Sequence, residues 1–173
     1  IDGNFGNCNP KNKKNFRSRC SAVIMSKDRT ILIDTSPDLR DQLLKNKIRN
    51  INSVIYTHNH ADQTHGINDL RVFYIKNKKK IPIYANKLTK KYLSESFSYC
   101  FKKFQDYPAT LELNNIKNKL NFGKYIKIEC VTVQHGLIKS LSFIINKKIA
   151  YLPDVNKIYK KDLKKFKNLF FLV

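Results

Sequence analysis

The chain has 173 residues, enough for one domain with a sizeable core and too few for two ordinary ones. Hydrophobic residues make up 42% of it and aromatic residues 12%, which excludes an intrinsically disordered chain in spite of a net charge of +21. No apolar run approaches the roughly 20 residues that a membrane-spanning helix needs, so an integral membrane protein is excluded as well.

The first part of the chain predicts a loop, a β-hairpin, a helix and a strand. Lys27-Asp28-Arg29 lies between two β-prone runs and is expected to form the hairpin turn. Pro37 suits the first turn of a helix, and Ser36 is its predicted N-cap. The elements in chain order are a loop over 1–18, strands over 21–26 and 30–34, a helix that ends near 47 and a strand over 53–57.

The second part of the chain is richer in strands. The predicted elements are a strand over 81–84, a helix over 89–101, an irregular stretch at Tyr107-Pro108, strands over 126–133, 141–145 and 148–152, a basic amphipathic helix over 159–166 and a strand over 168–173. No repeat or low-complexity linker divides the chain. Hairpins interspersed with helices predict a layered α/β fold with the sheets inside and the helices outside.

Three of the four histidines fall within eight positions, directly after the strand over 53–57. If the backbone is extended there, His58, His60 and Asp62 point to one side and can face a common point. Two imidazoles and a carboxylate suit Zn²⁺, Mn²⁺ or Fe²⁺, and the absence of a nearby thiolate argues against a closed structural zinc site. The alternative is a set of exposed loop histidines.

Two more candidate ligands follow later strands. His135 ends a strand next to Gly136 and is a candidate third nitrogen ligand, with a hydrogen bond in a turn as the alternative. Asp154 also follows a strand and is placed to bridge two metals, with an N-cap role for the next segment as the alternative. Together with the histidine cluster, these residues predict a metal centre built from strand ends.

The run His-x-His-x-Asp, the later strand-end His and the final Asp resemble the metallo-β-lactamase superfamily, and within it the branch that contains the cyclic phosphodiesterase PhnP. The segments that resemble this branch are Asp34-Thr-Ser-Pro-Asp-Leu-Arg40, Gly66-Ile-Asn-Asp-Leu-Arg71, Tyr107-Pro108 and Tyr151-Leu-Pro-Asp154-Val155. Two segments near the N-terminus, Gly6-Asn-Cys-Asn-Pro-Lys-Asn12 and Arg19-Cys-Ser21, are similar to segments in a subset of its relatives. The resemblance spans nearly the whole chain.

This resemblance implies a four-layered αββα metallo-β-lactamase sandwich, truncated at both ends. Residues 1–173 would form one such domain with its C-terminal part missing. The resemblance implies two divalent metal ions, Zn or Mn. The ligands would be His58, His60 and His135 for the first metal and Asp62 for the second, with Asp154 bridging.

The second metal site departs from the family pattern. The family motif usually continues with a histidine where this chain has Gln63, and an amide is a poor substitute for imidazole. His65, three residues after Asp62, could compensate, although capping or hydrogen bonding of the loop is an equal alternative. The last metal-binding histidine of the family is expected beyond residue 173.

The resemblance implies a hydrolase that cleaves a small phosphodiester with a metal-bound hydroxide, oriented by Asp62 or Asp154. Asp34 and Asp38 are expected to hydrogen-bond the ligand imidazoles. Arg40 and Arg71 are candidates for clamping a substrate phosphate, although surface arginines are the commoner case. An RNA-processing nuclease of the same superfamily and a non-catalytic metal-binding module are the alternatives.

The large positive charge does not by itself identify a binding partner. The chain has 34 Lys and Arg against 13 Asp and Glu, but the lysines are scattered and lack arginine–aromatic interleaving, so a solvated surface is favoured over a nucleic-acid interface. The irregularly spaced cysteines Cys8, Cys20, Cys100 and Cys130 indicate free intracellular thiols. We expect a cytoplasmic protein with no membrane partner, and a homodimer stays open.

Overall fold

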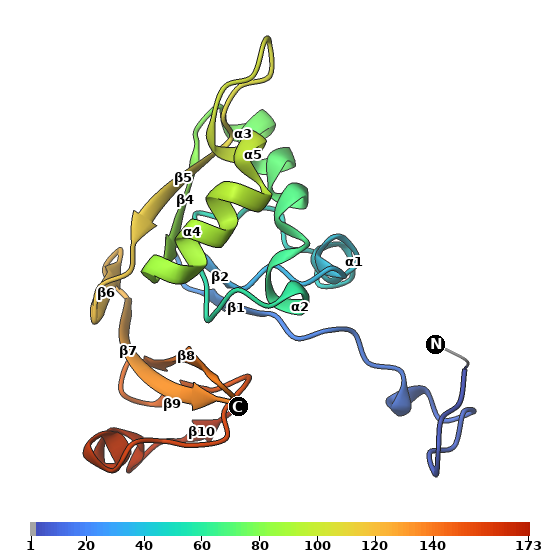
Figure 1. Ribbon diagram of the computed structural model, residues 1–173, viewed down its shortest axis with the longest axis vertical. Helices are drawn as coiled ribbons and strands as arrows, with labels where there is room; N and C mark the ends of the chain where they lie inside the picture. Colours follow the sequence, from blue (N-terminus) through green and yellow to red (C-terminus); the bar gives the residue numbers. More distant parts are fainter. Residues whose placement is uncertain (1–2) are drawn as a thin grey trace.

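The computed structural model describes residues 3–173 and contains two five-stranded β-sheets (Figure 1). In the first sheet the strand order is β1-β2-β3-β4-β5; β1 and β2 form the expected antiparallel hairpin, and the later neighbours are parallel. Parallel neighbours need crossover connections, and helices supply them. The strands are β1 (Ala22–Met25), β2 (Thr30–Ile33), β3 (Ser53–Ile55), β4 (Ile81–Ala85) and β5 (Leu111–Asn115).

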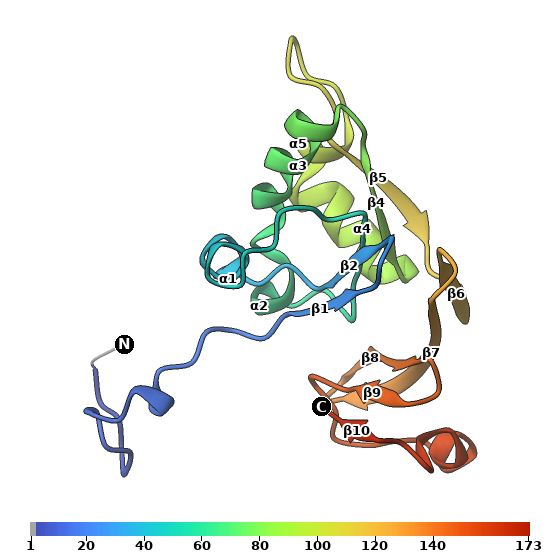
Figure 2. The ribbon, with the colours of Figure 1, turned by 180° about the vertical axis from the view of Figure 1, so that it is seen from behind.

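The helices of these crossovers lie on the face of the first sheet that points away from the second (Figures 1 and 2). They are α1 (Leu39–Lys45), α2 (Ala61–Thr64), η2 (Ile67–Leu70), α3 (Arg71–Asn77), α4 (Lys87–Ser96) and α5 (Ser98–Phe101). Residues 3–17 extend from the sandwich as an arm that contains the short 3₁₀ helix η1 (Lys13–Asn15) (Figure 2), whereas residues 18–21 contact the folded part. In the described part of the chain, no helix has the length and apolar character needed to cross a membrane.

The second sheet has the order β10-β9-β8-β7-β6 and is antiparallel except for the parallel pair β9 and β10. Its strands are β6 (Lys119–Phe122), β7 (Ile126–His135), β8 (Ile138–Ile145), β9 (Ile149–Tyr151) and β10 (Phe171–Leu172). The 3₁₀ helix η3 (Lys160–Phe166) lies against its outer face, where Phe166 packs on a cluster formed by Val131, Ile144 and Ala150.

Two apolar layers enclose the first sheet. Ile31 and Ile33 belong to the cluster between the sheets, whereas Leu32 belongs to the cluster beneath the helices, and each is at most 1% exposed. Successive side chains of a strand point to opposite faces, so a continuously apolar strand is buried on both. With η3 as the outermost layer, the fold is the four-layered αββα sandwich that the resemblance implies.

The structure corrects the predicted start of the first helix. α1 begins at Leu39 and its N-cap position is Asp38, so Ser36 is not the N-cap. The Ser36 hydroxyl instead accepts the Asp38 N–H at 3.2 Å and donates to Gln42 Oε1 at 2.9 Å. Ser36 therefore orders the loop before the helix rather than its first turn.

Other differences arise where local preference is weak. The helix expected over 89–101 is divided at Phe97, whose φ of −127° and ψ of 38° leave the helical region, and the segment 159–166 is largely a 3₁₀ helix. The sequence pattern does not predict α3, β5 or β6. Both strands contain several Asn, Lys or Glu residues, which are depleted in strands, so only their sheet neighbours define them.

Candidate metal centre

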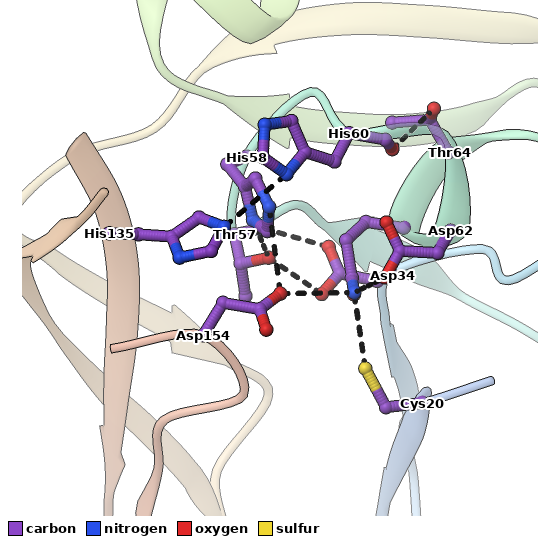
Figure 3. A network of polar contacts seen from close by, with 10 residues as sticks. Cys20, Asp34, Thr57, His58, His60, Asp62, Thr64, His135 and Asp154 are labelled. Carbon is purple, nitrogen blue, oxygen red and sulfur yellow. Dashed lines mark hydrogen bonds and ion pairs between the residues drawn. The ribbon is translucent and has the colours of Figure 1, made fainter. Parts of the chain in front are cut away.

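Three imidazoles from the two sheets converge at one edge of the sandwich (Figure 3). His58 and His60 follow β3, and His135 is the last residue of β7. One ring nitrogen of each lies within 4.8 Å of the others, and the ring centroids are 4.5 to 5.1 Å apart. His135 Nε2 is 3.3 Å from His60 Nδ1. The sheets therefore bring together the three histidines that the sequence predicts as ligands of the first metal.

The backbone that carries the motif is extended only in its first half. His60 has φ −68° and ψ 155° and is the N-cap residue of α2, and its ring packs edge to face with that of His58. Asp62 already lies in the first turn of that helix. The expected extended run of three alternating ligands is therefore wrong for Asp62, because the helix begins at Ala61.

His58 presents a buried nitrogen that finds no hydrogen-bond partner among residues 3–173. Its side chain is 1% exposed, and Nε2 lies 3.6 Å from Asp154 Oδ2, beyond hydrogen-bonding distance. Burial and the nearby His60 lower the pKa of His58 to about 4, so its imidazole is neutral near pH 7. An unpartnered buried polar atom is costly, and a lone pair that faces a carboxylate oxygen calls for a cation between them.

The nitrogen and oxygen separations fit such a cation. Metal–ligand distances of about 2.1 Å at tetrahedral angles place ligand atoms about 3.4 Å apart. The observed separations are 3.3 Å between His60 Nδ1 and His135 Nε2 and 3.6 Å between His58 Nε2 and Asp154 Oδ2. The three histidines therefore suit a divalent metal, and Asp154 lies beside one of them, His58, as a candidate oxygen ligand.

Thr57 connects Asp34 to His58. Asp34 is fully buried with a left-handed φ of 58°, and its two oxygens accept the Thr57 N–H and hydroxyl, each at 2.8 Å. The same hydroxyl oxygen lies 3.0 Å from His58 Nδ1. When Asp34 is ionised, its carboxylate only accepts, so Thr57 donates to Asp34 and accepts from Nδ1–H, which leaves the Nε2 lone pair available. Asp34 thus reaches the imidazole through a hydroxyl, not directly as expected.

Burial has a strong effect on the charge of Asp34. It raises the pKa of Asp34 to about 8, and the nearby carboxylates of Asp154 and Asp62 raise it further, while the two hydrogen bonds from Thr57 lower it. A cation on His58 favours the ionised carboxylate. The tautomer of His58 that can bind metal and the charge of Asp34 therefore depend on each other.

Gln63 lies between two carboxylates beside the histidines. Its side chain is fully buried, and Nε2 is 3.0 Å from Asp62 Oδ2 and 3.3 Å from Asp154 Oδ2. Cys20 Sγ lies 3.1 Å from Nε2 and 3.4 Å from Oε1. Burial raises the pKa of the Cys20 thiol, which therefore keeps its proton. Neither Thr57 nor Cys20 is a predicted site residue, and only the position of Thr57 next to His58 gives a signal in the sequence.

Two predicted residues face other partners. Asp38 accepts the Arg19 N–H at 2.7 Å and pairs with its guanidinium at 2.9 Å, which holds the pKa of Asp38 below its usual value. The expected bond from Asp38 to a ligand imidazole is therefore wrong. His65 Nε2 lies 3.0 Å from the Tyr92 hydroxyl, and its ring packs against Phe97, so His65 faces α4 and not the carboxylates.

The two arginines that the sequence suggests for substrate binding border a different feature. The Arg71 guanidinium lies over the Tyr107 ring, 4.6 Å from its centroid, and Arg40 is exposed beside Asp41. Both line a groove of about 670 Å³ between α1 and α3 that no histidine borders. A role of Arg40 or Arg71 in clamping a substrate phosphate stays a prediction.

Comparison with known proteins identifies the relatives of the chain. A family model described as "Beta-lactamase superfamily domain" matches residues 29–173. The chain is 29% identical over 165 residues to an octanoyltransferase of Porphyromonas gingivalis, a match that covers 93% of this chain and 33% of that protein. The chain thus spans a third of this curated relative.

Solved structures show the same architecture. A diphosphatase from the PhnP family is 28% identical with a TM-score of 0.82, and the match covers 94% of this chain and 62% of that one. Zn²⁺-bound PqqB from Methylobacterium extorquens is 15% identical with a TM-score of 0.68, covering 88% and 58%. The short form of human tRNase Z is 17% identical with a TM-score of 0.67, covering 90% and 70%. The last two likenesses establish the fold alone.

Proposed function

The chain belongs to the metallo-β-lactamase superfamily and is PhnP-like, and from this premise we propose that it is a metal-dependent hydrolase of phosphate esters, phosphodiesters above all. The observation that carries the proposal is the unpartnered Nε2 of His58, which faces Asp154 inside a cluster of three imidazoles. The similarity to a PhnP-family diphosphatase supports phosphorus rather than carbon as the centre attacked. A net charge of +21 suits an anionic substrate.

We propose that His58, His60, His135 and Asp154 hold the divalent cation. When bound, the cation supplies Lewis-acid chemistry toward a phosphoryl oxygen and water. Three neutral imidazoles and one carboxylate leave the centre with a net positive charge, which attracts a phosphoester. His60 is exposed and His58 buried, so the substrate approaches from the side of His60.

The carboxylates beside the histidines are suited to accept a hydrogen bond from an attacking water. Asp62 and Asp154 both direct Oδ2 toward the Gln63 amide, which fixes their orientation. Oδ1 of either carboxylate can then accept a hydrogen bond from an attacking water and orient it. In this proposal Thr57 and Asp34 act behind the ligands and keep His58 in the tautomer that binds metal.

Removing the metal is expected to abolish hydrolysis reversibly. The purified protein, dialysed against a chelator, should lose cleavage of a generic aryl phosphodiester and regain it when Zn²⁺ or Mn²⁺ is added back. Release of the aryl alcohol and metal analysis of the same samples provide the measurement. Unchanged hydrolysis by metal-free protein, or none by metal-loaded protein, would contradict the proposed function.

Asp34→Asn is expected to weaken metal binding about 10- to 100-fold, the usual effect of losing a group behind a ligand. An asparagine amide donates to the Thr57 hydroxyl, which then donates to His58 Nδ1 and shifts the imidazole proton to Nε2. A metal titration against a competing chelator measures the affinity. Asp38→Asn removes the same charge four residues away and should leave the affinity unchanged; equal losses in both variants would rule out this role for Asp34.

A further inference from the structure

We propose that this chain binds one divalent cation and not a pair, because the Gln63 amide takes the place of a second cation between Asp62 and Asp154. The inference rests on the proposed function, since it assumes that the three histidines bind a metal. Gln63 is fully buried, and its Nε2 lies 3.0 Å from Asp62 Oδ2 and 3.3 Å from Asp154 Oδ2. An amide nitrogen keeps both hydrogens and offers a metal no lone pair.

The orientation of the amide follows from its neighbours. The reversed amide would direct Oε1 at two carboxylate oxygens, so Nε2 faces them and its two hydrogens make the stronger, charge-assisted bonds. Oε1 then accepts from the Cys20 thiol at 3.4 Å, and the same sulfur lies 3.1 Å from Nε2. Cys20 therefore contacts both polar atoms of the amide.

The backbone of Gln63 is held as firmly as its side chain. Its carbonyl accepts the Thr35 N–H at 2.8 Å, and its own N–H donates to the His60 carbonyl at 3.1 Å. Because main chain and side chain are both fixed within a buried environment, moving the amide aside would break several hydrogen bonds at once. A cation between the carboxylates would have to displace it.

The electrostatics of the two carboxylates differ accordingly. The cation on the histidines compensates Asp154, which contacts His58. Asp62 is stabilised by the neutral amide donor and by its exposure to water, so it does not need a second cation. If position 63 carried a carboxylate of the same shape, three acidic groups would share one small space and repel each other. A second divalent ion would relieve that repulsion, because clustered carboxylate oxygens bind hard cations.

The test is the number of cations bound per chain after dialysis against Zn²⁺ or Mn²⁺, measured by elemental analysis. We expect about one for the natural chain and about two for Gln63→Glu. Gln42→Glu is the matched control, because Gln42 bonds Ser18 and Arg19 away from the histidines, and it should stay near one. Asp62→Asn keeps the amide in place and should also stay near one, which retains the test if Gln63→Glu does not fold.

Each outcome points to a different conclusion. About two cations on the natural chain, or the loss of a cation in Asp62→Asn, would overturn the single-cation proposal and leave the proposed function intact. A folded Gln63→Glu variant that stays at one would show that the amide is not what prevents the second cation. No bound cation on the natural chain would overturn the proposed function itself.

Discussion

Replacing His60 with alanine is expected to remove the bound cation and to lower phosphodiester hydrolysis about a thousandfold. A metal contributes several kcal/mol to a phosphoryl-transfer transition state, and each 1.36 kcal/mol corresponds to about tenfold in rate. His60 Nδ1 and His135 Nε2 are 3.3 Å apart, so both can bind the same cation. Removing the His60 imidazole leaves the cation with two nitrogen ligands instead of three. Metal content and the rate of aryl phosphodiester cleavage on the same preparation measure both effects.

The fold should survive this change. His60 is exposed, so its truncation removes little core packing, and the thermal midpoint should stay close to that of the natural chain. His65→Ala is the matched control, because His65 contacts Tyr92 and Phe97 instead of the cluster. It should retain metal and rate. If His60→Ala kept both metal and hydrolysis, the centre would lie elsewhere.

The sequence predicts the strands that lead into the site better than it predicts the layers around them. The apolar runs that become β2, β3 and β8 have strong β preference and are found by pattern alone. In β2, however, Ile31, Leu32 and Ile33 are all apolar, so no alternation shows which side chain faces the second sheet. The face on which each side chain lies depends on the helices and the second sheet that pack there, and their residues are distant in the sequence.

The ligands are more predictable from the sequence than the groups that orient them. His58, His60, His135 and Asp154 have metal-binding side chains at strand ends, and the structure brings them together. Cys20 is 43 residues from Gln63, and nothing in its local sequence indicates that contact. The role of Gln63 likewise depends on distances to Asp62 and Asp154 that spacing cannot give.

Behind the site, the loop after β2 is hydrogen-bonded to the C-terminal end of α2 and to Gly66 just beyond it. The Thr35 hydroxyl donates to the Thr64 carbonyl at 3.0 Å, and the Gly66 N–H donates to the Thr35 carbonyl at 2.9 Å. The same loop carries Asp34, whereas α2 carries Gln63. The close approach of Gly66 to this loop therefore fixes how the Asp34 carboxylate and the Gln63 amide lie relative to each other.

Gly66→Ala is expected to lower the free energy of unfolding by about 3 kcal/mol, because a buried side chain would have no space there. A Cβ would lie 1.9 Å from the Ser36 carbonyl oxygen and 2.9 Å from Leu39 Cβ, although the φ of −85° suits alanine. Urea unfolding measures the change. At Gly136 there is space, with nothing within 4 Å of an added Cβ, but the φ of +54° disfavours alanine. Gly136→Ala should therefore lower the free energy of unfolding by about 1 kcal/mol. Equal costs would show that the loop yields to the added methyl group.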